Sequence, residues 1–319
     1  MPGPKVLVEG QDQPESVQYT ILLTCVVLQS VGFVGCLLIL LTALVSRNVQ
    51  RHSTWISFMI TWVVSSAAYL LLFLSGNLHT LQPIYGLCLA QATMIYAVPI
   101  MTAASTLALV TQVLFNVRNL FRAGSRRNEN VWTFALLMIP YQLLSIMLVA
   151  CLLIGLYEPE TVHRSDLQTP YCNMINRIPS KISSISVASL MIPTIVLEVV
   201  ICGILKRNWR VLRNRTYPLT AIFRVIGFSV LGMLAVALSV LFAASEDRDP
   251  EVNIIISALS PSAFLIFGTQ HDIIRAWMFW RKEEVPEIKD SVNSRTELGS
   301  NFQFIDGSND RTSNGGTLP

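Results

Sequence analysis

Residues 52–117 contain no aspartate, glutamate, lysine or arginine. A membrane-spanning helix needs about 20 predominantly apolar residues to cross roughly 30 Å of hydrocarbon, and charged side chains are costly inside it. An uncharged stretch of this length accommodates two such helices and the loop between them. A typical soluble domain has about 25% charged residues, whereas this chain has 13% and a mean hydropathy of +0.52. The sequence therefore predicts an integral membrane protein.

Long apolar runs recur along the chain, separated by short polar segments. They are too long and too uniformly apolar for barrel strands, in which apolar residues alternate with polar ones. Helices also satisfy their own backbone hydrogen bonds, as hydrocarbon requires. We therefore predict an all-α membrane protein, a seven-transmembrane helix bundle. The predicted spans are residues 19–45, 54–75, 88–115, 131–156, 182–205, 218–245 and 252–268.

The distribution of lysine and arginine predicts the orientation. Fourteen of them flank the spans on one side, ahead of the carboxyl-terminal tail, and five lie on the other side together with an acidic cluster at residues 246–251. Positively charged loops stay in the cytoplasm. We expect an extracellular amino terminus at residues 1–18, the bundle at 19–268, and a cytoplasmic carboxyl-terminal tail at 283–319. That tail is rich in polar residues and is expected to be disordered.

The end of span seven predicts a second, shorter helix. Pro261 removes one helical hydrogen bond and is expected to kink the span, and Gly268 ends it. Thr269 is a candidate N-cap, and Asp272, three residues later, favours a helix start. Residues 269–282 gather apolar side chains, including Trp277 and Trp280, on one side. Such a helix lies in the inner interface of the bilayer; the alternative is a frayed continuation of span seven.

These features resemble G-protein-coupled receptors: seven spans, an outside amino terminus, a proline in span seven and an amphipathic helix behind it. The sequence FGTQHDIIRAW after a long apolar span is similar to the seven-transmembrane receptor-like proteins of fungi. The resemblance is architectural and covers about residues 19–282. It implies a receptor in the plasma membrane that signals to a heterotrimeric G protein, with the last helix as helix eight.

The resemblance also implies a disulfide between Cys88, at the outer end of span three, and Cys172, in the second outer loop. Both cysteines face an oxidising compartment, which permits the bond. Two motifs of the common receptor family are absent. No acid precedes Arg118 in VLFNVRNLF, and SPSAF at residues 260–264 stands where receptors have Asn-Pro-x-x-Tyr.

Two ionisable residues fall inside predicted spans, Glu198 in span five and Arg224 in span six. Such residues are costly in hydrocarbon and are functional candidates. Antiparallel spans joined by a short basic turn place them at similar depth. We predict an ion pair that holds spans five and six together in a resting state. The alternatives are a static structural pair and two side chains that reach separately to the headgroups.

The predicted cytoplasmic loops are basic. Loops of this kind suit the acidic surface of a Gα subunit, which the resemblance implies as a partner. They also satisfy the topology rule without any partner, and the net charge of +3 does not indicate nucleic-acid binding. The candidate G-protein-facing residues are Arg118, Arg122, Lys206, Arg207, Arg210 and Arg213.

The outer half of the bundle offers aromatic and polar side chains without a deeply buried charge. Such a set favours an extracellular ligand that is neutral or apolar, although ordinary helix packing is the alternative for each residue. The candidate ligand-pocket residues are Gln91, Tyr96, Gln142, Met191 and Asn253.

Other protein classes fit the sequence less well. A retinal protein needs a lysine in span seven, and residues 252–268 have none. The four histidines lie in loops or at span ends, so no catalytic or zinc-binding constellation is visible, and we expect neither enzymatic activity nor a cofactor. A transporter of a neutral solute is the alternative function, although its usual repeated halves are not evident.

Overall fold

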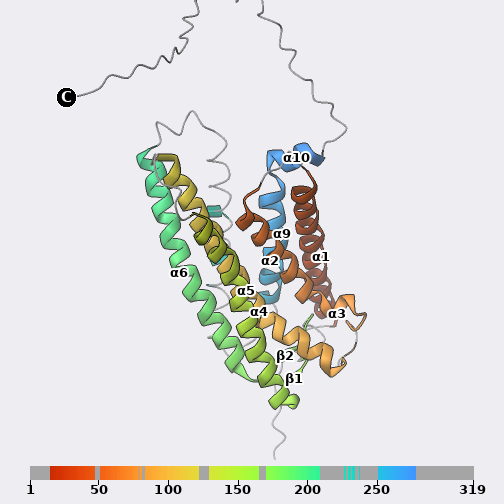
Figure 1. The fold of residues 1–319 in the computed structure, drawn as a ribbon. Coiled ribbons are helices and arrows are strands. Elements are labelled where there is room, and N and C mark those ends of the chain that lie inside the picture. Colours follow the sequence, from red (N-terminus) through yellow and green to blue (C-terminus); the bar gives the residue numbers. More distant parts are fainter. Residues whose placement is uncertain are drawn as a thin grey trace, which may run out of the picture. The chain divides into compact units, whose positions relative to one another are not determined.

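The computed structural model is built almost entirely from helices (Figure 1). It describes residues 15–46, 51–78, 80, 83–121, 129–164, 170–208 and 251–277, and scattered residues between 226 and 237. The helices are α1 (Glu15–Val45), α2 (Ser53–Tyr69), α3 (Leu71–Leu74), α4 (Tyr85–Phe121), α5 (Glu129–Tyr157), α6 (Arg177–Arg207), α9 (Glu251–Gly268) and α10 (His271–Trp277). Between α5 and α6 lie the 3-10 helix η1 (Pro159–Thr161) and two strands, β1 (Val162–His163) and β2 (Asn173–Met174).

Four of these helices are long and apolar enough to cross a membrane: Tyr19–Val45, Tyr85–Asn119, Val131–Tyr157 and Arg177–Arg207. The segment Asn253–Gly268 is apolar but shorter. The chain is therefore a helical protein of membrane type. The residues of predicted span six that the structure describes, such as Ile226, Ser229 and Met233, are helical. The count of seven spans and the orientation stay predictions.

α6 extends beyond its apolar run because a polar residue caps it. At the start of α6, the Asn176 side chain accepts a hydrogen bond from the Ile178 N–H at 3.0 Å, so the helix begins before the predicted residue 182. The predicted second span is divided into α2 and α3 by the single residue Leu70.

Gly76 ends this second helical segment. Its φ of +72° lies in the left-handed region, which glycine adopts without a Cβ penalty. The Gly76 N–H donates to the Phe73 carbonyl at 3.1 Å and the Asn77 N–H to the Leu72 carbonyl at 3.0 Å. This pair of bonds satisfies two carbonyls at the helix end.

α4 packs against α2, α5 and α6, while α1 packs against α2 and α9 (Figure 1). Two glycines let α1 and α9 approach closely. A Cβ added to Gly32 would lie 2.2 Å from the Ser260 Oγ, and one added to Gly35 would lie 2.3 Å from the Phe264 ring. Small residues at such contacts are the usual way for helices to pack in lipid, where van der Waals contact replaces the hydrophobic effect.

The buried apolar residues form two main clusters at opposite ends of α4. One contains Cys88, Leu89, Cys172 and Met174, and we call this end the lid end. The other contains Val117, Leu205, Phe267 and Ile273, and we call it the basic end, because Arg118, Lys206 and Arg207 lie in the last turns of α4 and α6.

The faces of α5 and α6 that turn away from their neighbours are apolar. On α6, Ile185 is 69% exposed and Val199 is 66% exposed, and on α5 Leu153 is 61% exposed. Exposed apolar residues in this number are expected where lipid, and not water, surrounds the helix.

Candidate functional site

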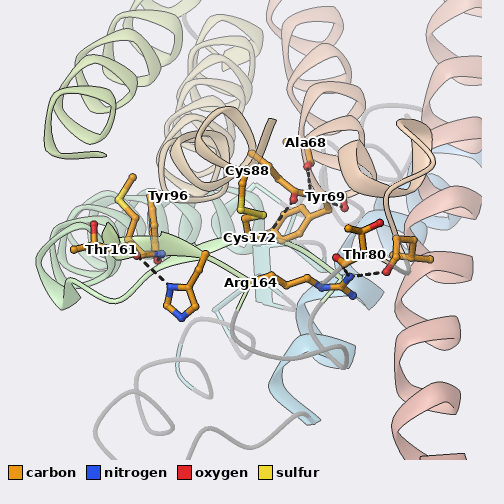
Figure 2. The surroundings of a disulfide bond; sticks show 12 residues. Ala68, Tyr69, Thr80, Cys88, Tyr96, Thr161, Arg164 and Cys172 are labelled. Carbon is orange, nitrogen blue, oxygen red and sulfur yellow. Dashed lines mark hydrogen bonds between the residues drawn. A yellow bond between two sulfur atoms is a disulfide. The ribbon is translucent and has the colours of Figure 1, made fainter. Parts of the chain in front are cut away.

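A disulfide joins Cys88, in the first turn of α4, to Cys172, immediately before β2 (Figure 2). The Cα atoms are 5.3 Å apart, and both residues are buried. This is the pairing that the resemblance implied. It fixes the segment between α5 and α6 to the beginning of α4.

That segment folds into a small hairpin. β1 and β2 pair antiparallel, with Val162 opposite Met174 and His163 opposite Asn173. Val162 and Met174 are buried and pack in the same cluster as Leu89 of α4. We call residues 159–164 and 170–176 the lid. Two apolar side chains and one disulfide therefore fix the lid to α4.

Gln91 supports the lid from beneath. It is fully buried on α4, and its Oε1 accepts a hydrogen bond from the Cys172 N–H at 3.0 Å. Its Nε2 donates to the Ala68 carbonyl at 3.2 Å, so one amide joins the lid, α4 and α2. Tyr96, one and a half turns further along α4, accepts a hydrogen bond from the Met174 N–H at its hydroxyl, at 3.2 Å. Both residues were predicted to line a ligand pocket, and in the structure both bind the lid.

Arg164 fastens the other side of the lid (Figure 2). Its guanidinium donates to the Leu78 carbonyl at 2.5 Å and to the Thr80 carbonyl at 3.3 Å. The side chain is 3% exposed, and this burial lowers the pKa of the guanidinium. No sequence pattern indicated this role, because a loop arginine with partners more than eighty residues away has no local pattern.

Three tyrosines lie where the lid meets the bundle: Tyr171 of the lid, and Tyr69 and Tyr96 of the helices. The Tyr69 and Tyr171 rings meet edge to face with centroids 5.7 Å apart, and the Tyr171 hydroxyl donates to the Asn253 Oδ1 at 2.5 Å. This bond brings the start of α9 to the lid. Tyr69 lies beside Tyr96, and its side chain is half-buried. Within the described part of the chain, the Tyr69 hydroxyl and the Asn253 amide nitrogen have no hydrogen-bond partner.

The other two predicted pocket residues lie elsewhere. Met191 is buried on α6 and belongs to the apolar cluster of the lid end. Gln142 is exposed on α5. The predicted set therefore divides into three residues that meet the lid, one core residue, and one that lies away from it.

Glu198 lies on the buried face of α6 and is 5% exposed. The hydroxyl of Ser229, which is 1% exposed, lies near its carboxyl group. The two groups are close but outside hydrogen-bond geometry, and neither the Glu198 Oε1 nor the Ser229 Oγ has a hydrogen-bond partner. Arg224 lies outside the described residues, so its ion pair with Glu198 stays a prediction.

A short helix after span seven is present as α10, but it begins one residue later than the Thr269 cap implies, and its place at the interface stays a prediction. The Gln270 carbonyl accepts from the N–H groups of Ile273 and Ile274. The Thr269 N–H and hydroxyl instead both donate to the Leu265 carbonyl in the last turn of α9, at 3.3 Å and 2.8 Å.

α10 is joined to α1 by a specific bond. The Trp277 Nε1–H donates to the Thr42 Oγ1 at 2.8 Å, so this tryptophan binds a neighbouring helix. The Asp272 side chain and Trp280 lie outside the described residues. Pro261 lies within α9, which continues through it as one helix, and the predicted kink remains a prediction.

Of the predicted G-protein-facing residues, Arg118, Lys206 and Arg207 are exposed in the last turns of α4 and α6. Arg122, Arg210 and Arg213 lie outside the described residues. Among the described residues, no three histidine, cysteine, aspartate or glutamate side chains are close enough together to hold a metal ion.

No protein-family model matches this chain, and a comparison with curated proteins finds no similar sequence.

Proposed function

We propose that this protein is a seven-transmembrane, receptor-like signalling protein of the plasma membrane. In this proposal the lid end faces outside and senses a neutral or apolar ligand. The basic end faces the cytoplasm and signals to a heterotrimeric G protein. The proposal rests on the arrangement of groups at the two ends and on the helix that joins them.

The observation that carries the proposal is α4. This one helix holds Cys88 and Gln91, which bind the lid, in its first two turns, and the exposed Arg118 in its last turn. At 1.5 Å per residue, its 37 residues span about 55 Å. It also packs against α2, α5 and α6. A ligand bound beneath the lid therefore has a direct path to the basic end through one continuous helix, as a signal receptor requires.

The chemistry beneath the lid supports a neutral ligand. The buried charge described there, Arg164, already binds two backbone carbonyls. Among the described residues, the Tyr69 hydroxyl and the Asn253 amide nitrogen have unused hydrogen-bonding capacity, and both are uncharged. A ligand with one or two polar atoms and an otherwise apolar body fits these groups and the surrounding aromatic rings.

The transporter alternative is less well supported. An outer gate has to open and close in every transport cycle. Here the lid is fixed by a covalent bond at Cys172, by two donors from Arg164 and by the amide of Gln91. These constraints oppose a large opening on that side.

The test is nucleotide exchange on Gα. The purified protein in nanodiscs is mixed with a panel of Gα subunits that includes fungal ones, and GDP release is timed. We expect faster release from at least one Gα, and a several-fold reduction in the variant Arg118→Gln/Arg207→Gln. The matched control is Arg177→Gln, since Arg177 is also an exposed arginine of α6 but lies at its lid end.

Two results would contradict the proposal. In the first, every Gα releases GDP at its intrinsic rate, and proteoliposomes that contain the protein take up a solute. The other is an equal loss of exchange in the basic-end variant and in Arg177→Gln, because the effect would then be one of general charge and not of a docking surface.

A further inference from the structure

The buried face of α6 carries an acidic group inside an apolar environment. Thr194, Glu198, Ile201 and Leu205 are all buried on this face. Ile201 and Leu205 belong to the same apolar cluster as Leu114 of α4. Glu198 lies nine residues before the end of α6 at Arg207, which places it about 13 Å inside the helix end.

The carboxyl group lacks the partners that such a position demands. Its Oε1 has no hydrogen-bond partner, and the hydroxyl of Ser229 nearby has none either. A third oxygen lies one turn away on the same face. The Thr194 hydroxyl is fully buried and donates its proton to the Leu190 carbonyl at 2.8 Å, so its lone pairs are left for another partner.

An ionised carboxylate in this environment costs several kcal/mol unless a positive charge or a proton neutralises it. A protonated carboxyl would use one of these oxygens as its acceptor, and neither the Glu198 Oε1 nor the Ser229 Oγ has a hydrogen-bond partner. A bound ion is one of the ways in which buried oxygens without hydrogen-bond partners are satisfied. Carboxylate and hydroxyl oxygens are hard ligands that suit alkali and alkaline-earth cations.

We propose that Glu198, Ser229 and Thr194 form a binding site for a monovalent metal cation between α6 and span six. One carboxylate balances one positive charge, whereas a divalent ion would leave a net charge buried among apolar residues. The bound ion joins α6 to span six and so stabilises the packed state of the bundle. This inference does not depend on the proposed receptor function.

Arg224 is the rival for the same carboxylate. Arg224 itself lies outside the described residues. The described neighbour of Glu198 is Ser229, and the experiment below distinguishes a bound ion from the arginine.

The test is the thermal stability of the full-length protein in nanodiscs at constant ionic strength, with Na⁺ replaced stepwise by choline. We expect the Tm to rise by roughly 3 °C between 0 and about 150 mM Na⁺, as linkage predicts for an ion bound in the millimolar range. K⁺ is titrated in parallel. The variants Glu198→Gln and Ser229→Ala should lose the Na⁺ response. Ser189→Ala is the matched control, because Ser189 is exposed on the same helix.

Each outcome decides the question. A saturable Na⁺ or K⁺ response that disappears in Glu198→Gln and persists in Ser189→Ala supports the site. A response that survives in Glu198→Gln overturns it. No response in the wild type overturns it as well, and Arg224→Met then identifies the cause. If the response appears only in that variant, the arginine neutralises Glu198; if it appears in neither, the carboxyl is protonated.

Discussion

The two ends of the bundle treat their buried polar groups differently. At the lid end, Gln91 uses both atoms of its amide and Arg164 binds two carbonyls. At the basic end, the side chains of Gln112, Glu198 and Gln270 are each less than a tenth exposed, and each has one oxygen without a hydrogen-bond partner.

This difference in hydrogen bonding indicates different roles for the lid end and the basic end. A satisfied buried network holds one conformation, because every alternative breaks several bonds at low dielectric. An unsatisfied buried oxygen costs about 1–3 kcal/mol, and such groups persist where another state or a bound ion supplies the partner. We infer that the lid end is the fixed part of the molecule and the basic end the part that changes.

The largest effect should come from the disulfide. Cys172→Ser removes the covalent bond and leaves Cys88 buried beside a hydroxyl. We expect the free energy of unfolding to fall by about 2–5 kcal/mol, which thermal unfolding of the purified protein measures. Cys202→Ser is the control, since Cys202 is exposed and unbridged. Equal stability of the two variants would show that the lid is not the fixed part.

The amide of Gln91 should come next. Gln91→Leu keeps much of the volume but leaves the Cys172 N–H and the Ala68 carbonyl without their partners. We expect a loss of about 2–3 kcal/mol. Amide hydrogen exchange at residue 172 provides a local measurement, and it should become faster than in the wild type. Unchanged exchange would mean that the amide does not hold the lid.

The contact between α1 and α9 runs along the bundle between the two ends. Gly32→Ala places a methyl group where the Ser260 hydroxyl lies, and we expect a loss of about 1–3 kcal/mol in thermal unfolding. Gly203→Ala is the matched control, because nothing lies within 4 Å of the added methyl. That control should gain up to about 1 kcal/mol from helix propensity. A loss of the same size in both variants would argue against close packing at Gly32.

Much of this fold could be predicted from the sequence, because apolar runs report directly on helices in lipid. The run at 252–268 agrees with α9 almost residue for residue. The ends of α6 were missed because its first turn is polar and is defined by the Asn176 cap. The residues Ser75, Gly76 and Asn77 did contain a readable signal for the end of the second helical segment, as glycine there favours a left-handed cap.

The site was less predictable. The Cys88–Cys172 pair came from a resemblance and not from spacing. β1 and β2 have two residues each, which is too short for any alternation to appear in the sequence. Gln91 and Tyr96 were selected correctly as important polar residues of α4, but their partners lie in a distant loop. Only the tertiary structure reveals that their hydrogen bonds go to the backbone of the lid.

The smallest effect, and the sharpest test of the comparison, should come from Gln112→Leu. Gln112 and Gln91 lie on the same helix, and both are buried. The Gln112 Nε2 donates to the Asn116 Oδ1 at 3.1 Å, one turn away, while its Oε1 has no partner. The substitution therefore removes one local bond and also removes one unsatisfied oxygen, so these two terms nearly cancel. We expect a change in the free energy of unfolding between zero and a gain of about 1 kcal/mol.

The same substitution at two positions of α4 thus separates the two ends. If thermal unfolding shows Gln112→Leu to be as costly as Gln91→Leu, the Gln112 oxygen has a strong partner in the membrane, and the basic end is as firmly bonded as the lid. If it is neutral in stability and alters nucleotide exchange on Gα, the oxygen is needed in a second conformation. An unbonded buried acceptor is a cost that such a second state can offset, so a stable variant with altered exchange would place the conformational change at the basic end.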